Sequence, residues 1–248
     1  MNRKKFETTI IENWASYFNC PAETTLHPGT TLLPEGKYDG ERVIALWYIG
    51  QHTFVQLDPA CFDRLDALVK TLPSQAALTG EHIQAAYGER SILSRDMGWT
   101  HYLFPPDLPD YLPPSPFYLR QLTEADADLM SALHTANTTE DVDEGYVEVT
   151  HQAVFGCFHD RELVAAASGY ERTGFMDIGV LAHPGFRKQG LGRAVVGALC
   201  NWSHQNGYIA QYRHNVVNTG SQKVAASLNF KMYFKSEGFT LKDQPDLG

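Results

Sequence analysis

Residues 177–193 read DIGVLAHPGFRKQGLGR, an apolar run followed by Pro-Gly, two basic residues and a Gly-x-Gly. The pattern predicts a β-strand over 176–182 that enters a helix at about Leu191 through a glycine-containing turn. The first turn of a helix carries unpaired N–H groups at the positive end of the helix dipole, and both favour an anion. Arg187 and Lys188 add positive charge, so this segment predicts a site for a phosphate or diphosphate.

Close packing of a helix on a strand would by itself also account for the glycines. The spacing of the residues around them is therefore needed to decide between a phosphate site and tight packing. Residues 187–192, RKQGLG, resemble the acyl-CoA diphosphate loop, Gln/Arg-x-x-Gly-x-Gly/Ala, of the GNAT superfamily of N-acyltransferases. The segments 215–221 (NVVNTGS) and 226–230 (ASLNF) resemble the Asn-bearing loop and the closing Leu-Gly-Phe element of that family. The resemblance covers about residues 117–241. A Rossmann fingerprint and a P-loop are excluded, because the residues that they require are absent at the right spacing.

The order of the predicted elements agrees with that resemblance. The predicted strands cover 117–122, 154–158, 163–167, 176–182, 208–216 and a pair within 231–241, and the predicted helices cover 123–136, 191–206 and 219–228. Thr123 and Asp126 are typical of a capping box at the start of the first of these helices. The mixed order predicts an α/β fold of the α+β type, with a GNAT-like mixed central β-sheet flanked by helices.

The N-terminal part predicts a separate, smaller α/β domain, with a helix over 6–18, a β-hairpin over 43–57 and a helix that begins at about Asp58. We find no phosphate loop, metal cluster or nucleophile motif in it, so its role is open. Six of the 13 prolines lie in 105–116, which predicts an extended linker. The predicted organisation is therefore an N-terminal domain over 1–104, a linker over 105–116 and an acyltransferase domain over 117–248.

The charge of the chain is unevenly distributed. The 248 residues carry a formal net charge of −9, which excludes a general nucleic-acid binder because phosphate neutralisation needs a basic surface. No acid occurs in 178–236, which contains seven basic residues, whereas 121–148 contains eight acids and no Lys or Arg. Chance clustering on solvated faces would also produce this pattern. The acid-free segment coincides with the elements that the resemblance assigns to the anionic CoA, which favours the functional interpretation.

Targeting signals and cysteines indicate the compartment. No apolar run follows the basic residues at the start of the chain and no window is apolar enough for a membrane span, so we expect neither a signal peptide nor a membrane partner. Cys20, Cys61, Cys157 and Cys200 are far apart and lack zinc or Cys-x-x-Cys spacing. They predict free thiols in a reducing compartment, and hence a cytoplasmic protein.

The resemblance implies acetyl-CoA as the acyl donor and no metal. It assigns the pantetheine arm to the backbone at Leu181, Ala182 and His183, and the diphosphate to Arg187, Lys188, Gln189, Gly190, Leu191, Gly192 and Arg193. Asn218 and Ser221 would lie beside the thiol end of the cofactor. Asn218 suits equally well the N-cap of the following helix.

An amine that attacks the thioester directly needs a base, an oxyanion donor and a proton donor for the thiolate. The predicted base is Glu171 or Asp177. Glu171 has the alternative of a surface ion pair with Arg172 or Arg213. The predicted oxyanion donor is a backbone N–H near the end of the strand, at Leu181 or Ala182.

The proton donor is the least defined of the three groups. Many members of the family have a tyrosine five residues before the closing Phe, and Ala225 stands at that position in this chain. Ser221, Ser227, Tyr233 and solvent are the candidates that replace it.

Together these residues predict an acyl-CoA-dependent N-acetyltransferase that acts on an amine of a small molecule or peptide. The missing tyrosine leaves open a catalytically idle CoA-binding or regulatory protein, and the unassigned N-terminal part leaves open an interaction protein that recruits a partner. The acid-rich segment 140–148 lies where the family has a variable, substrate-facing element, and it either attracts a cationic amine or forms a solvated face.

Overall fold

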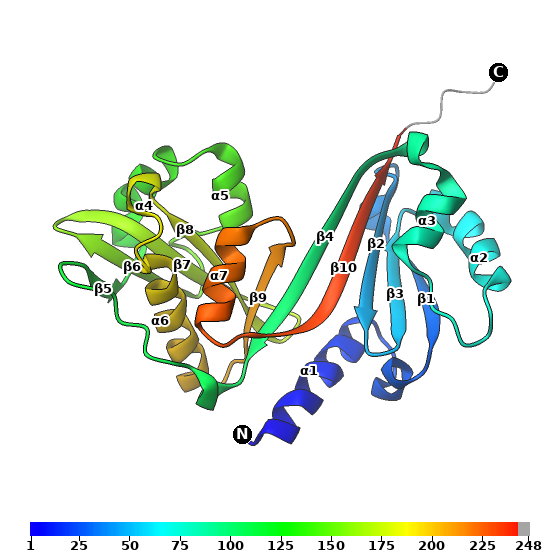
Figure 1. Cartoon of the computed structure of the whole chain (residues 1–248), viewed down its shortest axis with the longest axis horizontal. Coiled ribbons are helices and arrows are strands. Elements are labelled where there is room, and N and C mark those ends of the chain that lie inside the picture. Colours follow the sequence, from blue (N-terminus) through cyan, green and yellow to red (C-terminus); the bar gives the residue numbers. More distant parts are fainter. Residues whose placement is uncertain (243–248) are drawn as a thin grey trace. The chain divides into compact units, whose positions relative to one another are not determined.

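The computed structural model of the protein describes residues 1–242 and divides the chain into two compact units. One unit is His101–Met232, and the other combines Met1–Thr100 with the chain from Tyr233 onward. The second unit therefore includes the C-terminal strand, which the sequence analysis assigned to the acyltransferase domain. Each unit has its own layers of sheet and helix (Figure 1).

The proline-rich segment 105–116 lies within the unit His101–Met232 and packs along its longest helix. Leu108 and Tyr111 contact the apolar core of that unit. Gly197 of the helix makes room for Tyr111, because a Cβ at this position would collide with that side chain. The segment begins with a 3-10 turn at Pro105–Asp107 and then packs against the helix.

The unit His101–Met232 contains a mixed sheet with the strand order β9-β8-β7-β6-β5. The strands are β5 (Tyr118–Gln121), β6 (Ala153–His159), β7 (Glu162–Arg172), β8 (Phe175–Ala182) and β9 (Ala210–Asn215). The helices are α4 (Ala127–Thr135), α5 (Thr139–Gly145), α6 (Leu191–Gln205) and α7 (Thr219–Ser227). Only β8 and β9 pair in parallel, and the neighbours from β5 to β8 are antiparallel. The predicted mixed sheet flanked by helices is confirmed.

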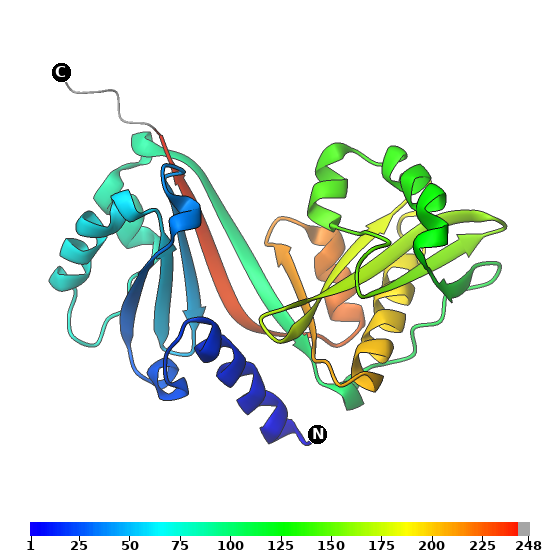
Figure 2. The ribbon, with the colours of Figure 1, turned by 180° about the vertical axis from the view of Figure 1, so that it is seen from behind.

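Small residues on alternate positions of β7 let helices cover both faces of this sheet (Figure 2). Ala165 and Ala167 belong to the core under α6 and α7, whereas Ala166 belongs to the core under α4. On β8, a Cβ at Gly179 would collide with the Gly145 carbonyl at the end of α5. The backbone of α5 therefore lies directly on β8.

β8 and β9 part after a short stretch of pairing. Their register comprises Met176↔Ala210 and Asp177↔Gln211. The Met176 N–H donates to the Ile209 carbonyl on the β9 side (3.0 Å), whereas the His183 N–H donates to β7. Backbone groups alternate in direction along an antiparallel strand, so residues 180 and 182 direct their N–H and C=O groups to the β9 side of β8, beyond the point at which the pairing with β9 ends.

The other unit contains a sheet with the strand order β1-β3-β2-β10-β4. The strands are β1 (Gly29–Pro34), β2 (Val43–Ile49), β3 (His52–Leu57), β4 (Ile92–Leu103) and β10 (Lys231–Leu241). The helices are α1 (Arg3–Tyr17), α2 (Phe62–Thr71) and α3 (Gly80–Tyr87). The predicted hairpin over 43–57 is confirmed by the antiparallel pairing of β2 with β3.

The predicted strand pair within 231–241 is wrong. β10 is one continuous strand that pairs antiparallel with β2, with Lys235 opposite Tyr48. Gly238, in the middle of the second half of β10, lies opposite Ala45 within this ladder, so no turn interrupts the strand there. The open edge of β2 provides a long-range partner, which local sequence patterns do not reveal.

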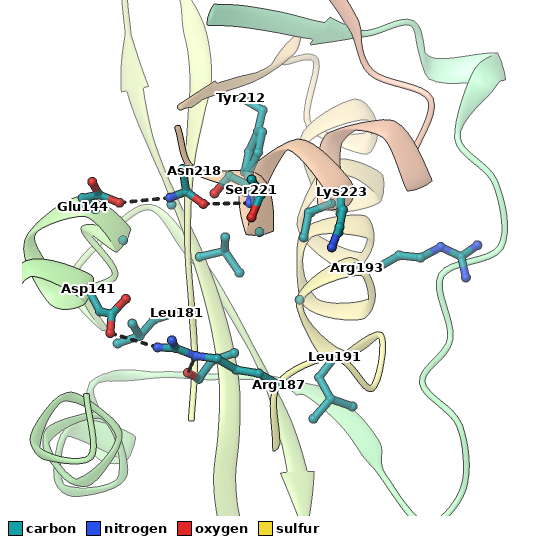
Figure 3. Close-up of a pocket in the computed structure, with 18 of the residues that line it drawn as sticks. Asp141, Glu144, Leu181, Arg187, Leu191, Arg193, Tyr212, Asn218, Ser221 and Lys223 are labelled. Atoms are coloured by element: carbon teal, nitrogen blue, oxygen red, sulfur yellow. Dashed lines mark hydrogen bonds and ion pairs between the residues drawn. The ribbon is translucent and has the colours of Figure 1, made fainter. Parts of the chain in front are cut away.

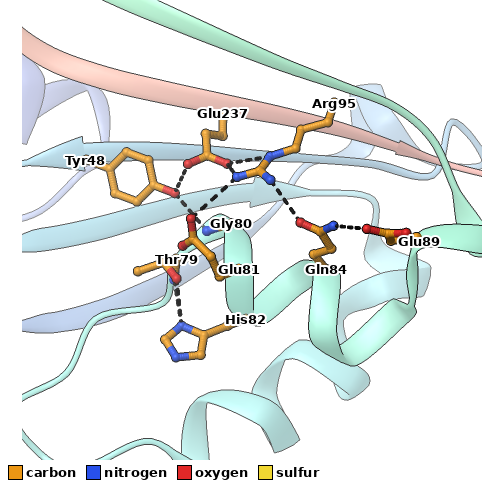
Figure 4. A network of polar contacts seen from close by, with 9 residues as sticks. All are labelled: Tyr48, Thr79, Gly80, Glu81, His82, Gln84, Glu89, Arg95 and Glu237. Carbon is orange, nitrogen blue, oxygen red and sulfur yellow. Dashed lines mark hydrogen bonds and ion pairs between the residues drawn. The ribbon is translucent and has the colours of Figure 1, made fainter.

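A buried carboxylate joins β10 to three other elements of the same unit (Figure 4). Glu237 is buried, and its Oε1 accepts a hydrogen bond from the Tyr48 hydroxyl of β2 (2.9 Å). Its Oε2 accepts from Nε and Nη2 of Arg95 on β4 (3.1 and 2.8 Å). The Gly80 N–H at the start of α3 donates to the Tyr48 oxygen (3.0 Å). These partners compensate for the desolvation of the carboxylate, so the network depends on all of them.

We expect the substitution Glu237→Ala to lower the free energy of unfolding by about 3–5 kcal/mol, because it leaves Arg95 without its buried partner. Denaturant titration of the purified variant measures the loss. The control is Asp66→Ala, which breaks the exposed pair of Asp66 with Lys70 and should cost less than about 1 kcal/mol. Equal losses for the two variants would contradict the assigned role of Glu237.

Candidate functional site

The turn between β8 and α6 has the backbone conformation that the glycine pattern predicts. Gly190 is the N-cap of α6 and has φ +80°. Because glycine has no side chain, no side chain at the N-cap pairs with the N–H groups of the first helical turn. Lys188 also has a positive φ, +65°, which is unfavourable for a residue with a Cβ. A strained turn next to uncapped N–H groups at the start of a 15-residue helix is a favourable place for an anion.

A pocket of about 500 Å³ opens in front of this turn. Its walls are the open edge of β8, the loop 186–188, the first turn of α6, β9, the start of α7 and the end of α5. Figure 3 shows side chains from these elements around one common space. The volume falls in the range that small-molecule and cofactor sites occupy.

Most of the residues predicted to hold the cofactor line this pocket. They are Leu181, Ala182, Arg187, Lys188, Gly190, Leu191, Gly192, Arg193, Asn218 and Ser221. His183 and Gln189 are not among the residues that line it. The His183 N–H donates to the Val164 carbonyl of β7 (2.9 Å), and its Nδ1 accepts from the Gly185 N–H (3.1 Å), so the first group serves the sheet and the second the turn.

The side chain of Arg187 spans the mouth of the pocket. Its Nε donates to the Ala182 carbonyl (3.2 Å), and its Nη2 donates to Asn137 (2.7 Å) and to Asp141 of α5 (3.0 Å). Burial raises the pKa of Asp141, but the hydrogen bonds from Arg187 and Thr138 outweigh this effect and leave the pKa below its usual range. Arg187 is thus partly neutralised by α5.

Of the other basic side chains around the turn, some face the pocket and one points away from it. The Arg193 guanidinium donates to the Asp110 carbonyl, and Figure 3 shows it pointing away from the space that the pocket residues enclose. Lys223 of α7 lines the pocket and was not among the predicted cofactor residues. Its membership of the acid-free segment 178–236 was the signal that marked it. The charge facing an anion therefore comes from Lys188 and Lys223 as well as Arg187.

Asn218 is the N-cap of α7, as one of its two interpretations predicted. Its Oδ1 accepts from the Ser221 N–H (2.9 Å), and its Nδ2 donates to Glu144 of α5 (2.9 Å). Asp141 and Glu144 therefore connect α5 to opposite sides of the pocket, to Arg187 on one side and to Asn218 on the other.

The two predicted bases lie outside the set of residues that line the pocket. Asp177 is buried, and it accepts hydrogen bonds from the Tyr170 hydroxyl (3.0 Å) and from Arg213 Nε and Nη2 (2.9 and 2.5 Å). Glu171 is exposed and lies opposite Met176, at the far end of β8 from Ala182. Arg213, one of the expected partners of Glu171, is paired with Asp177 instead.

The candidates for the proton donor are also separated by the fold. Ser221 and Ser227 line the pocket, whereas Tyr233 belongs to the other unit. Ala225 is buried in the core under α6 and α7. Tyr212 of β9 lines the pocket and was not predicted, because an aromatic residue inside a predicted strand is typical of the core.

The four cysteines are free, as predicted. Burial raises the pKa of the Cys157 thiol to about 11 and that of Cys200 above its usual range, so neither is activated as a nucleophile.

We expect Gly190→Glu to abolish binding of CoA, because it places negative charge at the uncapped helix N-terminus. The matched control is Gly190→Ala. No atom lies within 4 Å of a Cβ at this position, so alanine adds only the backbone strain of its positive φ and should retain binding within about tenfold. Isothermal titration of CoA against both variants measures the difference. Equal affinities for the glutamate variant and the unmodified protein would remove this turn from the site.

Comparisons with known proteins agree with the fold. Residues 118–230 match the model of the acetyltransferase (GNAT) family. No curated protein matches the chain. An acetyltransferase of the GNAT family from Colwellia psychrerythraea has a TM-score of 0.51 at 17% identity, over 76% of this chain and 76% of that one. A GCN5-related N-acetyltransferase from Sphaerobacter thermophilus has a TM-score of 0.50 at 12% identity, over 79% of this chain and 74% of that one.

These solved structures support the fold alone, and the family match covers the region that forms the pocket. It includes β8, the turn with Gly190, α6, β9 and α7. Residues 118–230 of this chain form a GNAT acetyltransferase domain.

Proposed function

We propose that the protein is an acetyl-CoA-dependent N-acetyltransferase that acts on an amine of a small molecule or peptide. The observation that carries this proposal is the junction of two features in one pocket. The open backbone edge of β8 leads directly to the uncapped N-terminus of α6. An extended chain with amide groups suits the first feature, and a diphosphate suits the second.

The residues around the pocket fit such a cofactor. The N–H groups of Val180 and Ala182 face the β9 side of β8, beyond the end of the pairing, and are suited to pair with the carbonyls of a pantetheine arm, whereas the Ala182 carbonyl already accepts from Arg187 Nε. The N–H groups at the start of α6 and the side chains of Lys188 and Lys223 would hold the phosphates. The bound thioester would supply an activated acyl group for the amine.

The direction of the backbone also selects the oxyanion donor. Leu181 directs its N–H towards β7, because it shares the orientation of His183, which bonds to Val164. The N–H of Val180 or Ala182 faces the β9 side of β8, and we propose that one of these two stabilises the oxyanion. Of the two positions predicted from the sequence, this retains Ala182.

The acceptor amine would approach from the side of α5. This helix contains four acids and no basic residue, and Glu144 lines the pocket. We propose that these carboxylates attract a cationic amine and that Glu144, which is hydrogen-bonded to Asn218, is placed to accept its proton directly or through water. Asp177 would act indirectly, as a positioning residue that holds Arg213 at the pocket wall.

The compartment is part of the same proposal. Among residues 1–242, none of the helices combines the length and the apolar character that crossing a membrane requires. Together with the free thiols, this is consistent with the cytoplasmic location that we propose.

We expect acetyl-CoA at 100 times its dissociation constant to stabilise the protein by about 2.7 kcal/mol and to raise its melting temperature by several degrees. Thermal denaturation with and without the ligand measures the shift. Release of free thiol from acetyl-CoA, followed with a panel of amines and peptides, then tests turnover. A melting temperature that acetyl-CoA leaves unchanged would contradict the cofactor assignment, and binding without thiol release on any amine would contradict the catalytic one.

A further inference from the structure

The hydroxyl of Tyr212 is a buried polar group for which the described part of the chain provides no hydrogen-bond acceptor. Tyr212 is 1% exposed, and its ring packs in the core under α6 and α7, with its centroid 5.6 Å from that of Phe230. Its oxygen has no hydrogen-bond partner among residues 1–242. Buried hydroxyl groups are nearly always paired in folded proteins, so a phenol left unpaired in this way calls for a partner from outside the chain.

The same residue lines the pocket, at the start of α7. Ser221 is a polar neighbour of Tyr212 there, and Figure 3 shows the two residues together. The Ser221 N–H is already bonded to Asn218 (2.9 Å). The Ser221 hydroxyl beside the phenol lowers the pKa of Tyr212, as a donor to the phenol oxygen does, and so leaves the proton of the phenol itself unused. The phenol therefore retains its capacity to donate at the end of the pocket where Asn218 and Ser221 lie.

The position of Tyr212 also accounts for the residue that the family resemblance expects on α7. Ala225 stands there, one helical turn after Ser221 and on the same face of the helix. Ala225 and Tyr212 are buried in the same core cluster. A phenol from β9 thus belongs to the same core cluster as the position at which a phenol from the helix is missing.

We propose that Tyr212 is the hydrogen-bond donor to the sulfur of the bound thioester, a role that rests on the proposed function. When the amine nitrogen bonds to the acyl carbon, the carbon–sulfur bond breaks and its electron pair goes to sulfur. The phenol stabilises the resulting thiolate by donating a hydrogen bond and keeps its own proton. The thiolate then takes a proton from solvent, and the proton lost by the amine goes to solvent through the base.

The ionisation of the phenol is consistent with a donor rather than an acid. Burial raises the pKa of Tyr212 to about 12, and the neighbouring Ser221 opposes this only in part. A thiol has an ordinary pKa of about 8.5, so the phenol stays protonated over the whole range in which the thiol ionises.

The test compares CoA with desulfo-CoA, which lacks the sulfur, as ligands of the full-length protein and its Tyr212→Phe variant. Isothermal titration gives both affinities at pH 7 and pH 9.5. We expect the unmodified protein to prefer CoA, by about tenfold or more at pH 9.5 where the thiolate accepts a charged hydrogen bond. We expect the variant to bind the two ligands equally at both pH values.

The matched control is Tyr208→Phe, which removes a hydroxyl that accepts a hydrogen bond from Gln152 outside the pocket. It should keep the preference of the unmodified protein. Because the Tyr212 hydroxyl has no partner to lose, Tyr212→Phe should also leave the melting temperature unchanged or raise it. In turnover, kcat should fall by about 10–100-fold while KM for acetyl-CoA changes by less than about threefold.

The outcomes separate this inference from the function on which it rests. If CoA and desulfo-CoA both fail to bind the unmodified protein, the proposed function and the role of Tyr212 fail together. If CoA binds and Tyr212→Phe keeps the full preference for the sulfur, only the role of Tyr212 is overturned. A clear drop in melting temperature for Tyr212→Phe would also overturn it, since that result reveals a structural partner for the hydroxyl.

Discussion

The ion pair between Asp177 and Arg213 lies where the pairing of β8 with β9 ends and the two strands diverge. The strands pair at Asp177 and Gln211, and the next residues of each strand already line the pocket. Both Arg213 Nε and Nη2 bind the buried carboxylate, and the Tyr170 hydroxyl adds a third hydrogen bond from β7. Such a pair is costly to break in a low-dielectric interior, so it fixes where the ladder ends and the open edge begins. The pocket, its backbone donors and the placement of Tyr212 all follow from that point.

Only some of the basic residues in the acid-free segment 178–236 face the pocket in the folded domain. The segment 178–236 has no acid, which suggested that its basic residues surround an anion together. In the folded domain Arg213 is neutralised by Asp177, and Arg193 is directed at the Asp110 carbonyl. The backbone of the α6 N-terminus, Lys188, Lys223 and the partly neutralised Arg187 are left to face the pocket. The absence of carboxylates from this segment matters as much as its basic residues, because no Asp or Glu within 178–236 can pair with the basic groups that face the pocket.

Much of this domain could be predicted from local signals, and the remainder depends on long-range contacts. The capping box of Thr123 and Asp126 and the positive φ of Gly190 are encoded within a few residues, and both are observed. The pairing of β10 with β2 joins segments almost 200 residues apart in sequence, as the hydrogen bond from Tyr48 to Glu237 illustrates, and no local pattern encodes it. The pocket residues on β8 and α6 were found because they form one continuous motif. Tyr212 was missed, because only packing in three dimensions decides whether a hydroxyl inside a strand finds a partner.

The membership of β10 in the N-terminal unit has a consequence for how the chain is made. The unit His101–Met232 is continuous, so β5 to β9 are present before β10 is completed. The N-terminal unit cannot complete its sheet until β10, which contains Glu237, has been synthesised. Most of that unit nevertheless leaves the ribosome first. The usual order, in which the N-terminal domain folds first, is therefore reversed for completion of the two units. In architectural terms the unit His101–Met232 is an insertion between β4 and β10 of the other unit. Until residues 101–232 have been synthesised, the β2 edge has no strand to cover it.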